Sequence, residues 1–299
     1  MRREQLQPRK FNELSRRDFI QRTGMLGALV TQRDALAVVG SSAADSAKIA
    51  FNTANLVARV TNYRYELKNW MEQHKKTIAA TDAASWRSIC HEIAEAGFKA
   101  VEIWDAHASP EALDRGKATE WKKILKQAGL KPVAYAGHLS SETLQICGWL
   151  EIPHIDGGLG TLKPEQATDL CRKSEIGFNI ENHPEKTPEE ILKKIGGGNQ
   201  WLGVCIDTGW LGTQGVSAPD VIRACGSLVR HVHIKDVKAA GKHETCLLGD
   251  GVVNVAGCLR ALRTLNYTGS YSWEDEPEDR NPFDSAKRNR QWIVQHLAG

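Results

Sequence analysis

The chain has 299 residues and a mass of 33.1 kDa, which fits one α/β domain of about 250 residues with an extension. Hydrophobic residues make up 41% of it and charged residues 25%, so a disordered or fibrous chain is excluded. A net charge of +3 is too small to indicate a nucleic acid or an anionic membrane as partner, and no apolar run is long enough for an ordinary membrane span.

The first 47 residues differ from the rest of the chain. The segment Ser15–Gln21 (SRRDFIQ) resembles a twin-arginine export signal, and a modest apolar stretch, Gly24–Val30, follows it. Charged residues then interrupt that stretch, so an N-terminal extension that is never cleaved is the alternative. We expect residues 1–47 to be such a leader or extension and residues 48–299 to form the domain. A leader would export the folded protein to the periplasm, whereas an uncleaved extension would leave it in the cytoplasm.

From Lys48 onward, short apolar runs alternate with stretches that have apolar residues at helical spacing. Eight such runs are expected to be strands: Lys48–Thr53, Lys99–Trp104, Pro132–Gly137, Ile152–Gly157, Ile176–Ile180, Leu202–Ile206, Val229–Ile234 and Gly269–Trp273. Eight strands alternating with helices over about 250 residues predict a single (β/α)8 TIM barrel. A doubly wound sheet is the alternative, but its glycine-rich phosphate fingerprint is missing, because Gly196–Gly198 ends a helical stretch.

Polar residues end the inward rows of the last four expected strands. Side chains in a barrel strand alternate between the interior and the helices, and chemistry collects at the carboxyl ends. If the large apolar residues face the helices, the inward rows end in residues separated by 26, 26 and 41 positions: Glu181, Asp207, His233 and Glu274. The register therefore places all four on one rim of the barrel.

Three carboxylates converging without a counter-charge would repel one another and raise their pKa values. A divalent cation removes that cost. One histidine with three carboxylates is a hard, oxygen-rich set that suits Mn²⁺ or Mg²⁺ better than Co²⁺ or Zn²⁺. The seven cysteines are scattered without a CxxC pair, which excludes a thiolate zinc site. We expect one divalent ion, with manganese as the first choice.

Five segments, in their order and spacing, resemble the xylose-isomerase-like sugar isomerase/epimerase superfamily, which includes ketose 3-epimerases, hydroxypyruvate isomerase and inosose dehydratase. They are Ile180–Pro184, Cys205–Gly209, Val232–Asp236, Leu248–Gly251 and Ser272–Glu274. The resemblance runs from about Lys48 to the C-terminus. It implies that Glu181, Asp207, His233 and Glu274 are the metal ligands. It also implies that Glu181 and Glu274 are the acid/base pair on opposite faces of the sugar carbon.

The sequence departs from that pattern at one position. Family epimerases often carry a substrate-binding histidine three residues after the aspartate of strand six, where this chain has Trp210. An indole offers a flat apolar surface in place of a hydrogen bond. The change argues against a plain ketohexose epimerase and favours a bulkier ligand, such as a glycoside with a group that stacks on the ring.

Four other inward residues are candidates for substrate contacts: Trp104, His138, His183 and Lys235. The alternatives are a barrel plug for Trp104, which shares its inward row with Glu102, and a hydrogen-bonded rim residue for His183. Deeper polar residues are expected to be structural: His154, Asp156 and His231. The acidic residues that follow Glu274 are expected to form a solvated loop.

These features predict a metal-dependent isomerase or epimerase that abstracts a proton next to the ketone of a sugar through an enediolate, with two carboxylates as acid and base. A lyase or dehydratase that acts on a keto-sugar or a 3-keto-glycoside through the same first step is the alternative. A hydrolase resembling the abasic-site endonucleases is a remote third reading, which the near-neutral charge and the lack of a basic track oppose. The expected partner is a small sugar or glycoside, with no nucleic acid or membrane, and a homo-oligomer stays open.

Overall fold

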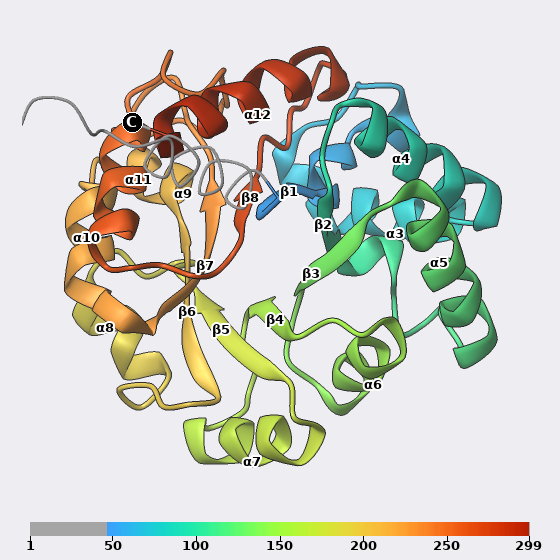
Figure 1. Cartoon of the computed structure of the whole chain (residues 1–299), viewed down its shortest axis with the longest axis horizontal. Helices are drawn as coiled ribbons and strands as arrows, with labels where there is room; N and C mark the ends of the chain where they lie inside the picture. The colour runs from blue at the N-terminus through green and yellow to red at the C-terminus, as the bar shows by residue number, and fades with distance from the viewer. Residues whose placement is uncertain (1–46, 299) are drawn as a thin grey trace, which may run out of the picture. The chain divides into compact units, whose positions relative to one another are not determined.

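The computed structural model describes residues 47–298, so the leader expected over residues 1–47 falls outside the described residues except for the last one. Its export role stays a prediction. Within the described range, eight strands form a closed parallel barrel in which each strand pairs with the next along the chain (Figure 1). They are β1 Ile49–Asn52, β2 Ala100–Trp104, β3 Lys131–Ala136, β4 His154–Gly157, β5 Gly177–Glu181, β6 Leu202–Asp207, β7 Val229–Ile234 and β8 Tyr271–Trp273.

Every strand overlaps one of the eight apolar runs that the sequence singles out, and the bounds differ by at most two residues. The barrel closes where β1 pairs with β8, with Ile49 opposite Tyr271. The predicted (β/α)8 barrel is therefore confirmed for the described residues. No helix in this part of the chain is long and apolar enough to cross a membrane.

Helices follow the strands and lie around them (Figure 1). They are α3 Trp70–Ala80, α4 Ala83–Glu95, α5 Arg115–Ala128, α6 Ser141–Leu150, α7 Pro164–Ser174, α8 Pro188–Lys194, α9 Thr208–Thr213, α10 Ala218–Cys225, α11 Val255–Thr264 and α12 Phe283–Ala298, with 3-10 turns η1 Thr53–Leu56, η2 Arg59–Thr61, η3 Leu67–Asn69, η4 Asp105–His107 and η5 Gly226–Leu228. Side-chain hydrogen bonds fix where several helices begin. Capping boxes at the beginnings of α4, α6 and α8 are formed by Asp82, Ser140 and Thr187. The three glycines after α8 all have positive φ, as a helix end followed by a turn requires.

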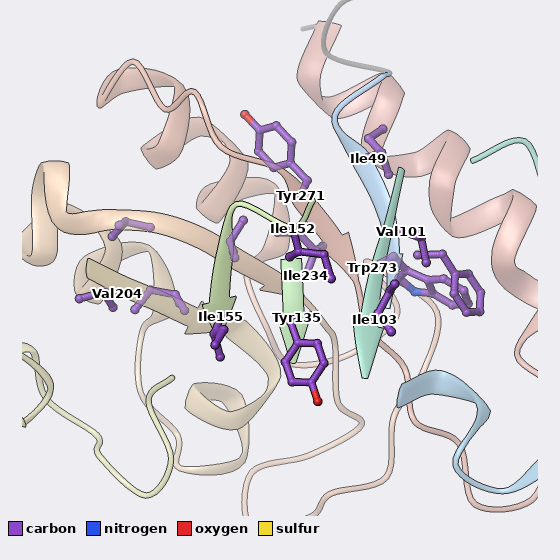
Figure 2. Packing of buried hydrophobic residues seen from close by; sticks show 14 of the residues in the cluster. Ile49, Val101, Ile103, Tyr135, Ile152, Ile155, Val204, Ile234, Tyr271 and Trp273 are labelled. Atoms are coloured by element: carbon purple, nitrogen blue, oxygen red, sulfur yellow. The ribbon is translucent and has the colours of Figure 1, made fainter. Parts of the chain in front are cut away.

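The main hydrophobic core lies between the strands and the helices (Figure 2). The outward residues of the strands, among them Phe178, Val204, Ile234 and Trp273, are fully buried there. Burial of such side chains stabilises the fold by about 1.5–3 kcal/mol each. The outward residues are thus the ones that the sequence analysis assumed to face the helices. The alternate residues of each strand therefore face the barrel interior.

The barrel interior is polar above a small apolar plug of Ala50, Ala100, Val133 and Ala134. Asn179 Nδ2 donates to Asp156 Oδ1 at 2.7 Å, and His154 Nδ1 lies 3.0 Å from Asp156 Oδ2. His231 Nε2 lies 2.9 Å from the Ser272 hydroxyl. These contacts support the structural role expected for the deeper histidines and aspartate.

Removing residues 1–47 is expected to leave a folded barrel, because β1 begins only at Ile49. The first hydrogen bond between β1 and β8, from Tyr271 N to the Lys48 carbonyl, also lies within the remaining residues. The shortened chain should unfold in one cooperative thermal transition, within about 4 °C of the full chain. Calorimetry of both chains measures this. Loss of the cooperative transition would show that the removed segment is part of the folded structure.

Candidate metal centre and substrate cavity

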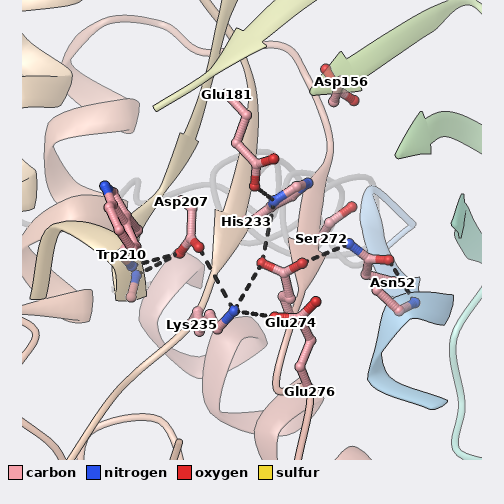
Figure 3. A network of polar contacts seen from close by, with 12 residues as sticks. Asn52, Asp156, Glu181, Asp207, Trp210, His233, Lys235, Ser272, Glu274 and Glu276 are labelled. Atoms are coloured by element: carbon pink, nitrogen blue, oxygen red, sulfur yellow. Dashed lines mark hydrogen bonds and ion pairs between the residues drawn. The ribbon is translucent and has the colours of Figure 1, made fainter. Parts of the chain in front are cut away.

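The four residues expected to hold a metal lie at the carboxyl end of the barrel. Glu181 and Asp207 are the last residues of β5 and β6, His233 is the penultimate residue of β7, and Glu274 follows β8 directly. Asp207 pairs in register with His233, which in turn pairs with Ser272. Figure 3 shows their side chains gathered around His233 and Lys235.

Three of the four converge closely. His233 Nδ1 lies 2.9 Å from Glu181 Oε1 and 3.2 Å from Glu274 Oε2. One ligand-type atom from each of these residues lies within 4.8 Å of the others. Glu274 Oε2 is buried and accepts no hydrogen bond. An unsatisfied buried carboxylate oxygen is costly, so the donor set fits a divalent cation and the buried cluster indicates a site for one.

Glu102 of β2 orients the histidine of this cluster. His233 Nε2 lies 3.0 Å from Glu102 Oε1, and because an ionised carboxylate can only accept, Nε2 carries a hydrogen. Once the Nδ1 proton is lost, a lone pair is aimed between Glu181 and Glu274. Metal-binding histidines commonly have such a carboxylate on the other ring nitrogen. The alternation along β2 predicts that Glu102 faces the barrel interior together with Trp104. It does not predict the contact with His233, which lies 131 positions away in the chain.

The pKa values of this group reflect burial opposed by charge. Burial would raise the pKa of Glu102, but His233 and His231 hold it well below its usual range. Burial would lower the pKa of His233, and the acidic groups around it, including Glu102, Glu274 and Glu181, hold it well above its usual range.

Asp207 lies to one side of the convergent three. Its Oδ1 accepts hydrogen bonds from the amides of Gly209 at 2.7 Å and Trp210 at 3.0 Å, which caps α9. Its Oδ2 lies 3.1 Å from His183 Nε2 and 3.7 Å from Lys235 Nζ. One carboxylate oxygen thus caps α9, and the other faces His183 and Lys235.

Lys235 stands between Asp207 and the other three. Its ammonium lies 3.6 Å from Glu274 Oε2 and is hydrogen-bonded to Glu276 (Figure 3). Burial would lower the pKa of Lys235, but Glu274, Glu276 and Asp207 outweigh it and raise the pKa. The structure therefore brings all four expected ligands to one rim, with a lysine cation interposed between Asp207 and Glu274.

Asp275 and Glu276 belong to the site, so the expectation of a mostly solvated loop is wrong for these two residues, whereas Glu278 and Asp279 are exposed as expected. Asp275 is 2% exposed, and the Glu276 side chain points to Lys235. Asn55 causes this, because its Nδ2 donates to the Trp273 carbonyl and its Oδ1 accepts from the Asp275 amide at 2.7 Å. Glu276 has φ 49°, a left-handed conformation that a glutamate adopts only when its surroundings impose it. Burial and the neighbouring Glu274 raise the pKa of Glu276 to about 7, against the opposing effect of Lys235.

A cavity of about 550 Å³ opens above the cluster. Its floor includes Glu181, Asp207, His233 and Glu274. All five residues expected to contact a substrate also line it: Trp104, His138, His183, Trp210 and Lys235. Sequence reasoning missed several others, namely Trp70, His74, His243 and Glu276. The volume lies within the range of roughly 300–1,000 Å³ that is usual for ligand sites.

The aromatic residues of the cavity are held by their neighbours. The Trp210 ring lies 4.7 Å from the His183 ring and 5.7 Å from the His243 ring, centroid to centroid. Burial would lower the pKa of His183, but Glu181 and Asp207 raise it to about 9. His138 fits only because residue 158 is glycine, since a Cβ there would lie 2.5 Å from His138 Nδ1.

Comparison with known proteins finds similarity in the second half of the chain. A family model described as xylose isomerase-like TIM barrel matches residues 164–296, a range that contains all four candidate ligands. That part of the chain is similar to the xylose isomerase-like TIM-barrel family. It is 27% identical over 161 residues to inosose dehydratase of Geobacillus thermodenitrificans, covering 46% of this chain and 52% of that protein. It is 23% identical over 141 residues to L-ribulose-5-phosphate 3-epimerase of Salmonella paratyphi A, covering 45% and 49%.

The chain thus spans about half the length of the curated relatives it matches. Among solved structures, a xylose isomerase-like TIM barrel protein from Mycobacterium smegmatis in complex with magnesium superposes with a TM-score of 0.63 at 16% identity, covering 85% of this chain and 98% of that one. D-psicose 3-epimerase superposes with a TM-score of 0.56 at 19% identity, covering 72% and 94%. At these identities the likeness shows the shared fold.

Gly209 makes room for the Lys235 side chain. A Cβ at residue 209 would lie 2.5 Å from Lys235 Cγ, so Gly209→Ala should push the ammonium away from Asp207. Because a displacement of about 1 Å can cost 10²-fold in rate, we expect turnover to fall by about that factor with the fold intact. Gly148→Ala is the matched control, since nothing lies within 4 Å of its added Cβ. Equal kcat in the two variants would show that the Lys235 position is immaterial.

Proposed function

We propose that this protein is a metal-dependent sugar isomerase or epimerase that moves a proton on the carbon next to a ketone. Glu181 and Glu274 are the acid/base pair. The observation that carries the proposal is the placement of two carboxylates on either side of His233 Nδ1, at 2.9 Å and 3.2 Å, on the floor of a cavity of about 550 Å³. The similarity to an L-ribulose-5-phosphate 3-epimerase and to an inosose dehydratase supports the same class.

The candidate metal ligands and Lys235 have different roles in the proposed reaction. Glu181, Asp207, His233 and Glu274 would hold one divalent ion, with manganese first and magnesium, cobalt or zinc as alternatives. When bound, that ion supplies Lewis-acid polarisation of the carbonyl, which acidifies the neighbouring C–H bond. One glutamate takes this proton, and the other returns a proton to the opposite face or to the adjacent carbon. Lys235, kept cationic by its acidic neighbours, orients a substrate oxygen.

A lyase is the second candidate, and Trp210 is the observation that favours it. Its ring lines the cavity beside His183, where an indole suits a bulky group better than a free hydroxyl. On a keto-sugar or a 3-keto-glycoside the first step is the same. The electron pair of the broken C–H bond then forms a C=C bond, and the oxygen β to the carbonyl leaves with its own bonding pair and takes up a proton.

Proton exchange in deuterated water tests the proposal. The manganese-loaded protein is incubated with keto-sugars and 3-keto-glycosides, and NMR follows the hydrogen on the carbon next to the ketone. We expect deuterium there, with a rearranged sugar from an isomerase or epimerase and a released second molecule from a lyase. Protein stripped by a chelator is the control. If no compound in the panel exchanges, the proton-transfer function is wrong.

A further inference from the structure

One wall of the cavity is largely apolar, and the hydroxyl groups of a small polyol would find few hydrogen-bond partners on it. Leu67, Trp70, Met71 and His74 line it. Their spacing of three and four residues places them on one face of η3 and α3. An adjacent face of the helix is anchored in the protein, where Gln73 Nε2 donates to the Val57 carbonyl at 2.7 Å. This anchoring keeps the first face directed at the cavity.

Two side chains of this face are exposed to solvent. Among the described residues, the large hydrophobic side chains that are exposed are Leu67 at 39%, Met71 at 66% and Val252 at 54%. The first two line the cavity, whereas Val252 does not. Apolar surface gathered at the mouth of a ligand site is typical of a binding surface.

The wall is rigid at its centre. The Trp70 ring packs 5.2 Å from the Trp104 ring, and His74 Nε2 lies 2.7 Å from Asp105 Oδ1. Trp210 follows β6 and Trp104 ends β2, and strands four apart face each other across an eight-stranded barrel. An apolar ring entering the mouth would therefore meet indoles from both sides, whereas the floor is made of carboxylates, imidazole and ammonium.

We propose that the cavity binds a glycoside, with its sugar ring over the polar floor and an aromatic aglycone against Leu67, Trp70 and Met71. The floor satisfies hydroxyl and carbonyl oxygens, and the wall offers a thioether, a leucine side chain and an indole, which contact an aromatic ring favourably. A free monosaccharide would leave this wall in water. The inference rests on the proposed function, since it names the substrate class of the same site.

Binding of paired glycosides to the full chain tests this inference. The manganese-loaded protein is titrated calorimetrically with phenyl and methyl glycosides of glucose, galactose and xylose, so that each pair differs only in the aglycone. We expect the phenyl member of at least one pair to bind about tenfold or more tighter. The Leu67→Gln/Met71→Gln variant should lose that preference, whereas the Val252→Gln variant, which changes an exposed apolar residue that does not line the cavity, should keep it.

Three results would overturn the inference: equal affinity within every pair, no binding of any phenyl glycoside, or an unchanged preference in the Leu67→Gln/Met71→Gln variant. The deuterium-exchange assay on free keto-sugars separates this failure from that of the proposed function. Exchange without a phenyl preference removes the aglycone site alone. A phenyl preference without exchange on any ketone removes the proton-transfer chemistry and leaves the binding site in place.

Discussion

Replacing Glu274 by glutamine is expected to lower turnover by roughly 10²–10⁴-fold, the usual contribution of a positioned acid or base. The amide keeps nearly the same volume but cannot accept the proton. Asn52 Nδ2 donates to Glu274 Oε1 at 3.1 Å, which favours an amide oxygen on that side and turns the NH₂ group towards His233. Turnover is therefore measured at saturating manganese and expressed per bound ion.

The matching Glu181→Gln variant assigns the direction of proton transfer. The variant that abolishes deuterium exchange has lost the base for that substrate, whereas the other should keep exchange and lose product. If both variants bind metal and keep near-wild-type turnover, the two-carboxylate mechanism is wrong. His138 or His183, which line the same cavity, would then be the next candidate base.

The alternation of side chains along the strands made most of this architecture predictable. Once Phe178 and Ile180 face the helices, Glu181 must face inward, and the same parity places Asp207, His233 and Glu274 on the same rim. Parity acts within a strand and needs no knowledge of distant contacts. This is why the barrel and the convergence of the candidate ligands follow from sequence alone.

The parts that sequence reasoning missed depend on contacts between distant residues. Glu102 meets His233 across the barrel, and Asn55 holds the segment after β8, 220 residues further along the chain, through the Asp275 amide. An acidic run beside a proline is typical of a solvated loop. No feature of the neighbouring sequence indicates that contacts with Asn55 and Lys235 hold Glu276 in the site. The spacing of Leu67, Trp70 and Met71 is visible in the sequence, but the face it defines is normally buried.

Loss of the metal is the second large effect that we expect. Replacing both Asp207 and His233 by alanine removes a carboxylate and the imidazole that lies between Glu181 and Glu274. Metal analysis should find about one divalent ion per wild-type chain and less than a tenth of that in the variant. A His91→Ala/Asp169→Ala variant removes the same residue types from exposed positions and should keep the wild-type content.

The thermal transition reports the same event without an activity assay. A ligand that binds only the folded chain stabilises it by about 2.7 kcal/mol at a hundred times its Kd, so manganese should raise the Tm of the wild type and of the control variant. It should leave the Tm of the Asp207→Ala/His233→Ala variant unchanged. Alanine at 207 also removes the cap of α9, at about 1 kcal/mol, and alanine at 233 leaves Glu102 buried with one partner fewer. The Asp207→Asn variant retains a capping oxygen and so provides a second, milder change. It should bind manganese more weakly than the wild type, and without metal its thermal stability should equal that of the wild type. Equal metal content in wild type and the double alanine variant would place the ion elsewhere or remove it from the mechanism.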